Sequence, residues 1–266
     1  MTNKYEELKE IQTIQYKILQ EVNRICQKHS ISYFLCYGTL LGAVRHKASI
    51  PWDYDIDIAM PRSEMMRFLQ YENELSSELK LEYICYSAIE VSGLVRVIRQ
   101  NVGKYGNVHI DMFILDFAKK RNRKLNKIVG MWCSFLHMAK LSENEKSILE
   151  KHFEGEKRKK IIVKLSRVAN KIFGGSERIE NWIYRIMVSD TPTKEYIILE
   201  DVRKNLEKEC FDEKIMLYYE NGKFPCPKGY KELLTMWYGD YMQYPEEGKK
   251  YLEYLKEKEK KEDNER

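Results

Sequence analysis

The stretch GTLLGAVRHKASIPWDYDIDIAMPR, residues 38–62, joins a Gly-Thr pair, a short helical run and three closely spaced aspartates. The aspartates, Asp53, Asp55 and Asp57, lie two residues apart, just where the chain otherwise has the composition of a buried strand. Side chains two apart on a strand point to the same face, so Asp55 and Asp57 are predicted to project side by side. Asp53 lies before the strand and is predicted to support this pair from a position beside it.

Two carboxylates this close repel each other and raise each other's pKa unless a cation lies between them. Hard oxygen ligands of this kind suit Mg²⁺, with Mn²⁺ as an alternative, and water and substrate phosphates complete the coordination. A third carboxylate, Asp111, lies inside the apolar run VHIDMFIL, residues 108–115, which also has the composition of a strand. If the two strands are neighbours, Asp111 joins Asp55 and Asp57, either as a metal ligand or as the base that deprotonates an attacking hydroxyl.

The residues before these aspartates are suited to binding a phosphate. Gly38 allows the backbone to approach a phosphate closely. The N–H groups at the start of a helix predicted over 40–46, capped by Thr39, point toward the same place. Together with the aspartates, these residues predict a metal-assisted phosphate site. Taken singly, each motif has a structural alternative, namely a solvated Asp-x-Asp pair or a plain helix cap.

The remaining pattern of apolar residues and turns predicts an α/β (α+β) fold. Helices are predicted over 8–29, 40–46, 63–79, 119–173 and 177–188, with a closing helix near the C-terminus. Strands are predicted over 32–37, 56–60, 81–87, 94–100, 108–115, 195–199 and 216–219. We expect a mixed sheet flanked by helices, with an added helical, lysine-rich region. The predicted parts are a catalytic core over 1–118, a basic helical region over 119–190, a C-terminal segment over 191–250 that packs on the core, and a charged tail over 251–266.

The order of strand, Gly-Thr, helix, strand with alternating aspartates and distant third aspartate resembles the nucleotidyltransferase fold of the polymerase β superfamily. Within it, GTLLGAVRH (38–46) and IPWDYDIDIAMPR (50–62) look like motifs of the LicD family of phosphocholine transferases, to which the fukutin-related ribitol-phosphate transferases are also similar. HIDMFILD (109–116) resembles the second acidic motif of that family, and FPCPKGYKELLTMWYGDYMQYP (224–245) resembles its C-terminal signature. The resemblance covers residues from about 10 to 250.

The resemblance implies transfer of a phospho-alcohol, typically phosphocholine, from CDP-choline or another CDP-alcohol donor. The implied acceptor is a hydroxyl of a cell-surface glycan, such as lipopolysaccharide or teichoic acid, or of its lipid-linked precursor. The resemblance places the metal on Asp55, Asp57 and Asp111, and the donor phosphates at Gly38 and Thr39. Which phospho-alcohol is moved and which glycan accepts it stay open.

The resemblance also implies roles for three arginines and for Asp53. Arg45 matches the family's motif arginine and is placed against a phosphate or the aspartates. Its alternative is a structural salt bridge with Asp53, which is itself a candidate for an outer contact with the substrate. Arg96 and Arg99, on the strand predicted before Asp111, are candidates for binding the diphosphate.

Two other functions stay as alternatives. A nucleotidyltransferase would move NMP from an NTP to a small molecule or sugar with the same carboxylates. An inactive nucleotide-binding scaffold would be expected to have lost an acid, yet Asp55, Asp57 and Asp111 are all present. Neither aromatic interleaving nor a helix-turn-helix pattern accompanies the basic residues, so we expect no nucleic-acid partner.

The composition favours a cytoplasmic protein. Six cysteines are scattered over the 266 residues without a C-x-x-C pair, which indicates neither a disulfide framework nor a zinc site and suits a reducing compartment. The N-terminal residues lack the apolar run of a signal peptide, and no stretch approaches the roughly 20 apolar residues that span a bilayer. We expect a cytoplasmic location, with at most peripheral contact at the inner face of the membrane.

The basic residues are concentrated in one stretch. Residues 119–171 contain 16 Lys and Arg against five Glu, whereas the formal net charge of the whole chain is +5. Within this stretch, NKIVGMWCSFLHMAKL (126–141) is too short to span a membrane but suits lying at the interface of one that contains anionic lipid. The alternative is a core helix with a solvated basic flank, which the general burial of apolar stripes favours.

Overall fold

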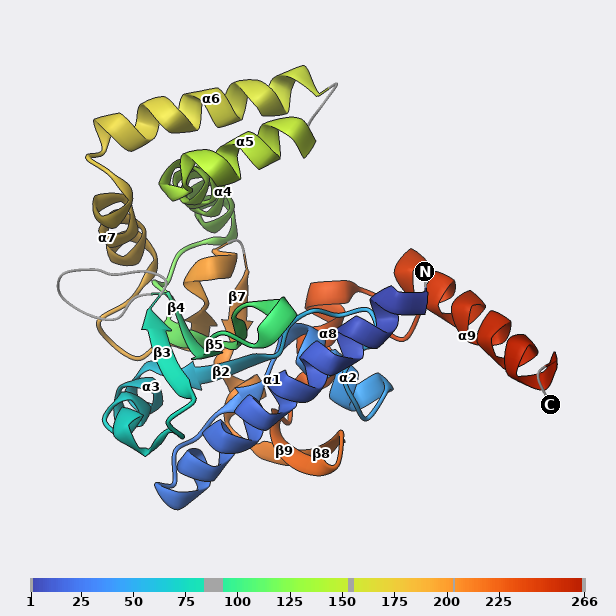
Figure 1. Ribbon diagram of the computed structural model, residues 1–266. Helices are drawn as coiled ribbons and strands as arrows, with labels where there is room; N and C mark the ends of the chain where they lie inside the picture. Colours follow the sequence, from blue (N-terminus) through green and yellow to red (C-terminus); the bar gives the residue numbers. More distant parts are fainter. Residues whose placement is uncertain (1, 84–92, 153–155, 203, 265–266) are drawn as a thin grey trace. The chain divides into compact units, whose positions relative to one another are not determined.

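The computed structural model describes residues 2–83, 93–152, 156–202 and 204–264 (Figure 1). Contacts divide the chain into two compact units. The first unit comprises Met1–Glu82, Arg96–Phe113 and Glu209–Arg266, and the second comprises Tyr83–Val95 and Ile114–Lys208. Every candidate site residue predicted from the sequence belongs to the first unit.

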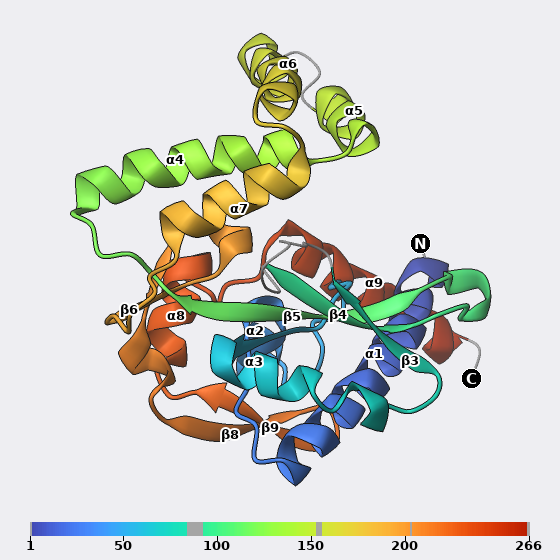
Figure 2. The same cartoon turned by 90° about the vertical axis from the view of Figure 1, so that its left-hand side faces the viewer.

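The first unit is built around a sheet with the strand order β1-β2-β5-β4-β3. The strands are Phe34–Leu35 (β1), Asp57–Pro61 (β2), Leu79–Tyr83 (β3), Leu94–Arg99 (β4) and Val108–Phe117 (β5). β1 pairs antiparallel with β2, with Phe34 opposite Ala59. β5 is the middle strand, with β2 on one side and β4 on the other. Figure 2 shows β4 beside β5. Side chains from three successive strands can therefore meet at β5.

Helices and a hairpin complete the first unit. They are α1 (Thr2–Lys28), α2 (Tyr37–Arg45), α3 (Arg62–Leu69), α8 (Tyr230–Tyr238) and α9 (Glu246–Asn264), with the antiparallel hairpin β8 (Lys214–Tyr219) and β9 (Gly222–Pro227) and the 3-10 turns Glu72–Glu74 and Gly103–Tyr105. α1 follows the predicted spacing of three and four residues, and its Ile18, Val22 and Ile25 are buried. Burial of this apolar stripe stabilises a helix that is polar on its other face.

The second unit carries the helical, lysine-rich region. Its elements are α4 (Arg123–Lys140), α5 (Glu143–His152), α6 (Lys157–Ile172), α7 (Ser176–Met187), β6 (Glu195–Ile197) and β7 (Asn205–Glu207), with the 3-10 turn Leu199–Asp201; a further 3-10 turn, Lys208–Phe211, leads back to the first unit. β6 pairs antiparallel with the end of β5, with Asp116 opposite Ile197. Buried side chains of α4 and α7, among them Leu136, Ile179 and Ile183, form its core.

The predicted α/β fold, with a mixed sheet, flanking helices and an added lysine-rich helical region, is confirmed. The four-part division of the chain stays a prediction. Among the residues that the structure describes, none of the helices combines the length and the apolar character that crossing a bilayer requires.

The helix predicted over 63–79 is wrong at its C-terminal end, because α3 ends at Leu69. The chain then turns back toward the end of α1. There the Glu74 carboxylate lies 2.9 Å from both Lys28 Nζ and His29 Nε2. These are tertiary contacts, which override local helix propensity and are not contained in the local pattern.

Two predicted strands differ most from the observed ones in their bounds. β1 keeps two residues of the predicted range 32–37, and α2 begins at Tyr37, the last residue of that range. β3 begins at Leu79, before the predicted range 81–87, and residues 84–87 lie outside the described part of the chain. Both differences concern element ends, where local sequence patterns are least informative.

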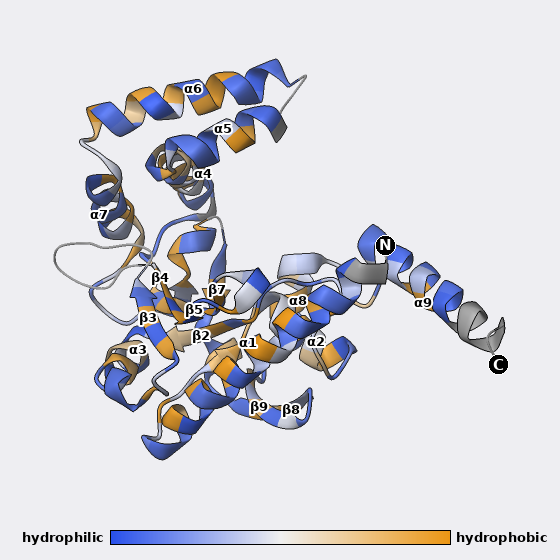
Figure 3. Cartoon of the chain, in the orientation of Figure 1, coloured by the Kyte–Doolittle hydropathy of each residue, from blue (hydrophilic) through white to orange (hydrophobic). Residues whose placement is uncertain are grey.

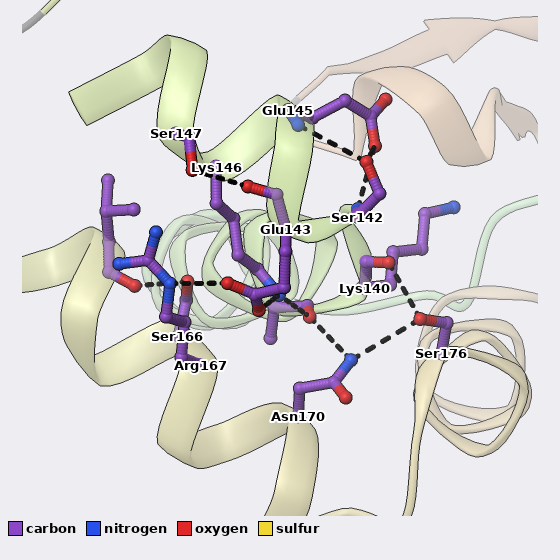
Figure 4. Close-up of polar contacts among 12 residues, drawn as sticks. Lys140, Ser142, Glu143, Glu145, Lys146, Ser147, Ser166, Arg167, Asn170 and Ser176 are labelled. Atoms are coloured by element: carbon purple, nitrogen blue, oxygen red, sulfur yellow. Dashed lines mark hydrogen bonds and ion pairs between the residues drawn. The ribbon is translucent and has the colours of Figure 1, made fainter. Parts of the chain in front are cut away.

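The single helix predicted over 119–173 is wrong, since the structure divides it into α4, α5 and α6. Figure 4 shows the break between α4 and α5. The Ser142 hydroxyl accepts a hydrogen bond from the Glu145 N–H at 3.2 Å, and the Glu145 carboxylate accepts one from the Ser142 N–H at 2.7 Å. This reciprocal pair is a capping box, S-x-x-E, a start signal for α5 that is visible in the sequence. The predicted break at Gly174 and Gly175 is confirmed, and both residues have positive φ.

Candidate active site

β2 and β5 bring the two acidic motifs together. The Asp111 N–H donates to the Ile56 carbonyl at 2.8 Å, so β5 runs directly beside the residues that lead into β2. Asp111 therefore lies next to the segment that carries Asp55 and Asp57, as expected if the two strands are neighbours. The pairing of two strands that are far apart in sequence gathers three carboxyls at one place.

Burial and mutual repulsion determine the charge state of these carboxyls. Burial raises the pKa of Asp57 well above its usual range, and the negative charges of Asp55, Asp111 and Asp53 raise it further. Burial also raises the pKa of Asp53 to about 7, with the charge of Asp55 and a hydrogen bond to its carboxyl as further causes. Asp53 and Asp57 thus lie in a region in which their charged forms are disfavoured.

Asp111 has a positive partner on the neighbouring strand. Arg96 Nε, from β4, lies 2.7 Å from Asp111 Oδ1, and His109 Nε2 lies 3.6 Å from the same oxygen. Burial lowers the pKa of His109, and the charge of Arg96 lowers it further, so the neutral imidazole is favoured. Arg96, predicted as a diphosphate candidate, is brought to the cluster through its ion pair with Asp111.

The carboxyl cluster fits a hard divalent cation in its chemistry. Within the described ranges, no three acidic, histidine or cysteine side chains are arranged as a finished metal-binding group, and Asp111 is turned toward Arg96. The donor set of Asp55, Asp57 and Asp111 nevertheless supplies carboxylate oxygens only, which Mg²⁺ prefers. The raised pKa of Asp57 agrees with this fit, because a cation between carboxylates offsets the repulsion that raises it. The metal ligands stay a prediction.

Gly38 is required by the close approach of Asp53. A Cβ atom at residue 38 would lie 2.3 Å from Asp53 Oδ2, which is closer than real Cβ contacts allow. Gly38 is in the first turn of α2, where the helix dipole favours a negative charge. The close approach that the sequence predicts for a phosphate is therefore made here by a carboxyl of the protein.

Thr39 supports the strand and does not cap the helix. α2 begins at Tyr37 and has Cys36 at its N-cap, without a side-chain cap bond, so the predicted cap is wrong. The buried Thr39 Oγ1 instead accepts a hydrogen bond from the Asp57 N–H at 2.7 Å. This hydrogen bond fixes the backbone of Asp57, the first residue of β2. The Thr39 hydroxyl, predicted to cap a helix, therefore positions Asp57.

Arg45 and Arg99 each have a partner outside the carboxyl cluster. Arg45 Nη1 donates to the carbonyls of Tyr241 at 2.8 Å and Gln243 at 3.1 Å. Arg99 Nη2 pairs with the Glu78 carboxylate at 2.6 Å. In the part of the chain that the structure describes, the alternative salt bridge between Arg45 and Asp53 is not formed. The predicted substrate contacts of both arginines stay predictions.

A cavity of about 290 Å³ opens beside Gly38 and Asp53. The cavity is lined by residues of the loop that carries Asp53 and by residues of the C-terminal signature segment, 224–245. Among them are Arg45, Trp52, Tyr238, Asp240 and Tyr241. Aromatic faces together with carboxyls attract a cationic group, and the guanidinium of Arg45 attracts a phosphate. The cavity therefore has the chemistry for a ligand that carries both charges.

Two glutamines of α1, which were not among the predicted site residues, form hydrogen bonds with the loop that carries Asp53. Gln12 Nε2 donates to the Asp53 carbonyl at 2.8 Å. Gln15 Nε2 donates to the carbonyls of Tyr54 at 2.8 Å and His109 at 3.1 Å. α1 thus connects the aspartate loop to β5. The available signal is a polar residue on an otherwise apolar helix face, because such a residue needs a partner when it is buried.

The sheet brings Asp111 of β5 beside Ile56, which lies between Asp55 and Asp57 at the start of β2. Residues 30–137 match the family LicD/FKTN/FKRP, nucleotidyltransferase domain. This match agrees with the motifs that resemble the LicD family.

Similar proteins extend this match beyond the domain. The chain is 29% identical over 262 aligned residues to lipopolysaccharide cholinephosphotransferase LicD of Haemophilus influenzae, with 90% of this chain and 93% of that protein covered. An uncharacterized protein of Rickettsia typhi is 38% identical over 55 residues, which are 21% of this chain and 18% of that protein. An uncharacterized protein of Rickettsia prowazekii is 36% identical over 55 residues, 21% of each chain.

Proposed function

We propose that this chain is a metal-dependent transferase that moves phosphocholine, or a related phospho-alcohol, from a CDP-linked donor to a hydroxyl of a cell-surface glycan. The proposed glycan is lipopolysaccharide or its lipid-linked precursor. The similarity that supports this substrate class is to a lipopolysaccharide cholinephosphotransferase and extends over 90% of this chain. The structural observation that carries the proposal is the meeting of Asp111 with Asp55 and Asp57 across β2 and β5.

In the proposed reaction, the acceptor oxygen attacks the phosphorus that carries the alcohol. The bond from that phosphorus to the bridging oxygen breaks, CMP leaves, and a carboxylate takes the hydroxyl proton. A bound Mg²⁺ would neutralise the developing charge on the phosphates, and Asp55, Asp57 and Asp111 would hold it. Arg96, positioned 2.7 Å from Asp111, is proposed to bind the diphosphate.

The cavity beside Asp53 is proposed to receive the alcohol end of the donor. Its aromatic and acidic side chains suit a quaternary ammonium group, since ring faces and carboxyls both attract a cation. Trp52 and Tyr238 are the proposed ring contacts, and Asp240 is the proposed counter-charge. A neutral polyol such as ribitol would gain less from this lining, so choline is favoured over ribitol.

Incubation of the purified protein with Mg²⁺ and either CDP-choline or CDP-ribitol tests the donor. We expect CMP release with an acceptor glycan present, faster from CDP-choline, and loss of release in Asp55→Asn. The exposed aspartate Asp190 of the second unit offers a matched control, and Asp190→Asn should keep the wild-type rate. Equal rates from both donors would contradict the choline assignment, and an active Asp55→Asn would contradict the metal site.

A nucleotidyltransferase that moves NMP from an NTP to a small molecule or sugar is the second candidate, because the matched domain has that description. The same assay separates the two, since an NTP substrate would release pyrophosphate in place of CMP. Turnover of neither donor, with nucleotide binding retained, would leave an inactive nucleotide-binding scaffold.

A cytoplasmic location is proposed along with this function. Four cysteines of the described residues, Cys26, Cys36, Cys133 and Cys226, are buried and carry free thiols. Free thiols suit a reducing compartment. No nucleic-acid partner is proposed. Cell fractionation of the tagged protein tests the location.

A further inference from the structure

α6 exposes an apolar stripe that none of the described residues of its unit covers. Ile161, Leu165, Val168 and Ile172 have exposed fractions of 56%, 54%, 54% and 75%. Their spacing of four, three and four residues places all of them on one side of the helix. Figure 3 shows the apolar bands along α6 that these residues contribute to. Solvent-exposed aliphatic side chains aligned in this way mark an interaction surface.

The opposite side of α6 is firmly bound within the second unit. Val163, Ser166 and Ala169 are buried. Arg167 pairs with Glu150 at 2.6 Å. Asn170 Nδ2 donates to the Ala139 carbonyl at 2.7 Å (Figure 4). The polar contacts orient the helix, so the exposed stripe is a consequence of how α6 is held.

The exposed apolar surface continues onto α4 and α7. Ile128, Met131 and Trp132 of α4 are exposed, as is Trp182 of α7. Phe173, directly after α6, connects the helices, because its ring centroid lies 6.2 Å from that of Trp132 and 6.4 Å from that of Trp182. The two exposed tryptophans have an apolar body and a polar N–H, which suits the boundary between hydrocarbon and water.

Lysines follow the edge of the α6 stripe. Lys157, Lys164 and Lys171, each exposed, are spaced by seven residues and lie along one edge, and Arg158 lies along the other. α6 contains seven Lys and Arg and no acidic residue. The surface is therefore apolar in the middle and positive at its border. This combination matches helices that lie in the headgroup region of a bilayer with anionic lipid.

From these observations we infer that the face formed by Ile161, Leu165, Val168 and Ile172, with its lysine border, docks the second unit on an anionic phospholipid surface. A second copy of this chain is disfavoured as the occupant, because a two-fold symmetric contact would bring like-charged lysine borders together. The sequence-based expectation of peripheral contact concerned residues 126–141, and the structure shifts its centre to α6. This inference does not depend on the proposed transferase activity.

Flotation with vesicles tests the inference, with phosphatidylcholine vesicles compared to vesicles that also contain phosphatidylglycerol. We expect binding to the anionic vesicles only, weakened by high salt. The double variant Leu165→Ser/Ile172→Ser should lower the partition coefficient by about tenfold or more, because it removes apolar insertion. Lys164→Gln/Lys171→Gln should lower it by about fivefold for each lysine.

Matched controls come from exposed positions of the first unit. Met66→Ser/Leu252→Ser removes two exposed apolar side chains from α3 and α9 and should leave binding unchanged. Lys228→Gln/Lys249→Gln removes the same net charge elsewhere and should have a small effect. Circular dichroism and melting temperatures verify that all variants fold.

Three outcomes would overturn the inference. One is no binding of the wild type to anionic vesicles. Another is an equal loss of binding in the first-unit controls, which would indicate a nonspecific effect of charge or hydrophobicity. The third is a concentration-dependent dimer in analytical ultracentrifugation that Leu165→Ser/Ile172→Ser dissociates without changing vesicle binding, which would assign the surface to a second copy of the chain.

Discussion

At the scale of single residues, Asp57 is the most constrained member of the carboxyl cluster. Its N–H is held by Thr39 Oγ1 at 2.7 Å, and its carboxyl is buried among the charges of Asp55, Asp111 and Asp53. The backbone is thus fixed while the side chain is electrostatically unfavourable. Groups held in this way gain from a bound cation, and stability without the cation is lower than the packing alone would give.

Asp57→Asn and Asp111→Asn should both lower transfer by about a hundredfold or more, because each removes a carboxylate from the charged site. Their melting temperatures should differ. Asp57→Asn removes a source of repulsion and should leave the melting temperature unchanged or raise it, measured in EDTA. Asp111→Asn removes the partner of Arg96, 2.7 Å away, and should lower it. A melting temperature of Asp57→Asn well below the wild type would show that its burial is not electrostatically costly.

Gly38→Ala should destabilise the protein by about 1–3 kcal/mol in urea unfolding, because the new methyl group meets Asp53 Oδ2 at 2.3 Å. The same substitution in an Asp53→Ala background should cost less, since the colliding carboxyl is gone. The difference between the two backgrounds is the coupling energy of this contact. Equal costs in both backgrounds would mean that Gly38 is required by the backbone and not by Asp53.

At the scale of elements, α4 packs into the core of the second unit with one face and is exposed to solvent on the other. Cys133, Leu136 and Ala139 are buried, whereas Ile128 and Met131 are exposed. The sequence left two alternatives for this helix, a core helix or an interfacial one. The structure confirms the core contacts of one face, and the membrane contact of the other face stays a proposal.

His137 of α4 should make the stability of the second unit depend on pH. Burial lowers its pKa from an ordinary 6.5 to about 4, and the charge of Lys140 lowers it further. In the unfolded chain the imidazole takes up a proton near pH 6.5, so the stability is full above that pH and is lost as pH falls toward 4. The loss should reach about 3 kcal/mol.

The variant His137→Leu tests this assignment, because it removes the titrating group and keeps an apolar side chain at the same place. The free energy of unfolding of the wild type should fall between pH 6.5 and 4 more steeply than that of the variant. Identical slopes in urea unfolding would place the pH dependence elsewhere.

At the scale of the whole molecule, the chain folds as two compact units, and the carboxyl cluster lies entirely in the first. A ligand that binds the native first unit stabilises that unit by mass action, and the size of the effect depends on ligand concentration. The location of the cluster therefore predicts a local response to a cation.

Addition of Mg²⁺ should increase protection from hydrogen exchange at β2 and β5 and leave α5 and α6 unchanged. The gain should be about 1.4 kcal/mol at a Mg²⁺ concentration tenfold above the dissociation constant. Asp55→Asn should abolish it, because that variant lacks one proposed ligand. Equal protection of both units, or protection that persists in Asp55→Asn, would contradict a metal site at these aspartates.

Much of the fold was predictable from the sequence because its signals are local. The apolar spacing of α1 predicts the helix, and Gly174 and Gly175 predict the end of α6. The capping box at Ser142 is an equally local signal, although the helical periodicity of the apolar residues continues across it. The end of α3 was not predictable, because it depends on Glu74 meeting Lys28 and His29 across the fold.

The sequence by itself determined which residues are proposed to carry the chemistry. Strand periodicity separates Asp55 and Asp57 from their apolar neighbours, and the apolar run around Asp111 marks a third carboxyl that needs a partner. The family resemblance rests on these same motifs and agrees with the match over residues 30–137.

Only the tertiary structure decided what each of these groups contacts. It turned Thr39 from a predicted cap into a support for Asp57, placed Asp53 against Gly38, and directed Arg45 to the C-terminal signature segment. The physical reason is distance along the chain. Helical and strand periodicity depend on residues within a few positions, whereas a hydrogen bond or an ion pair between segments depends on how sheets and helices pack, which no local pattern contains.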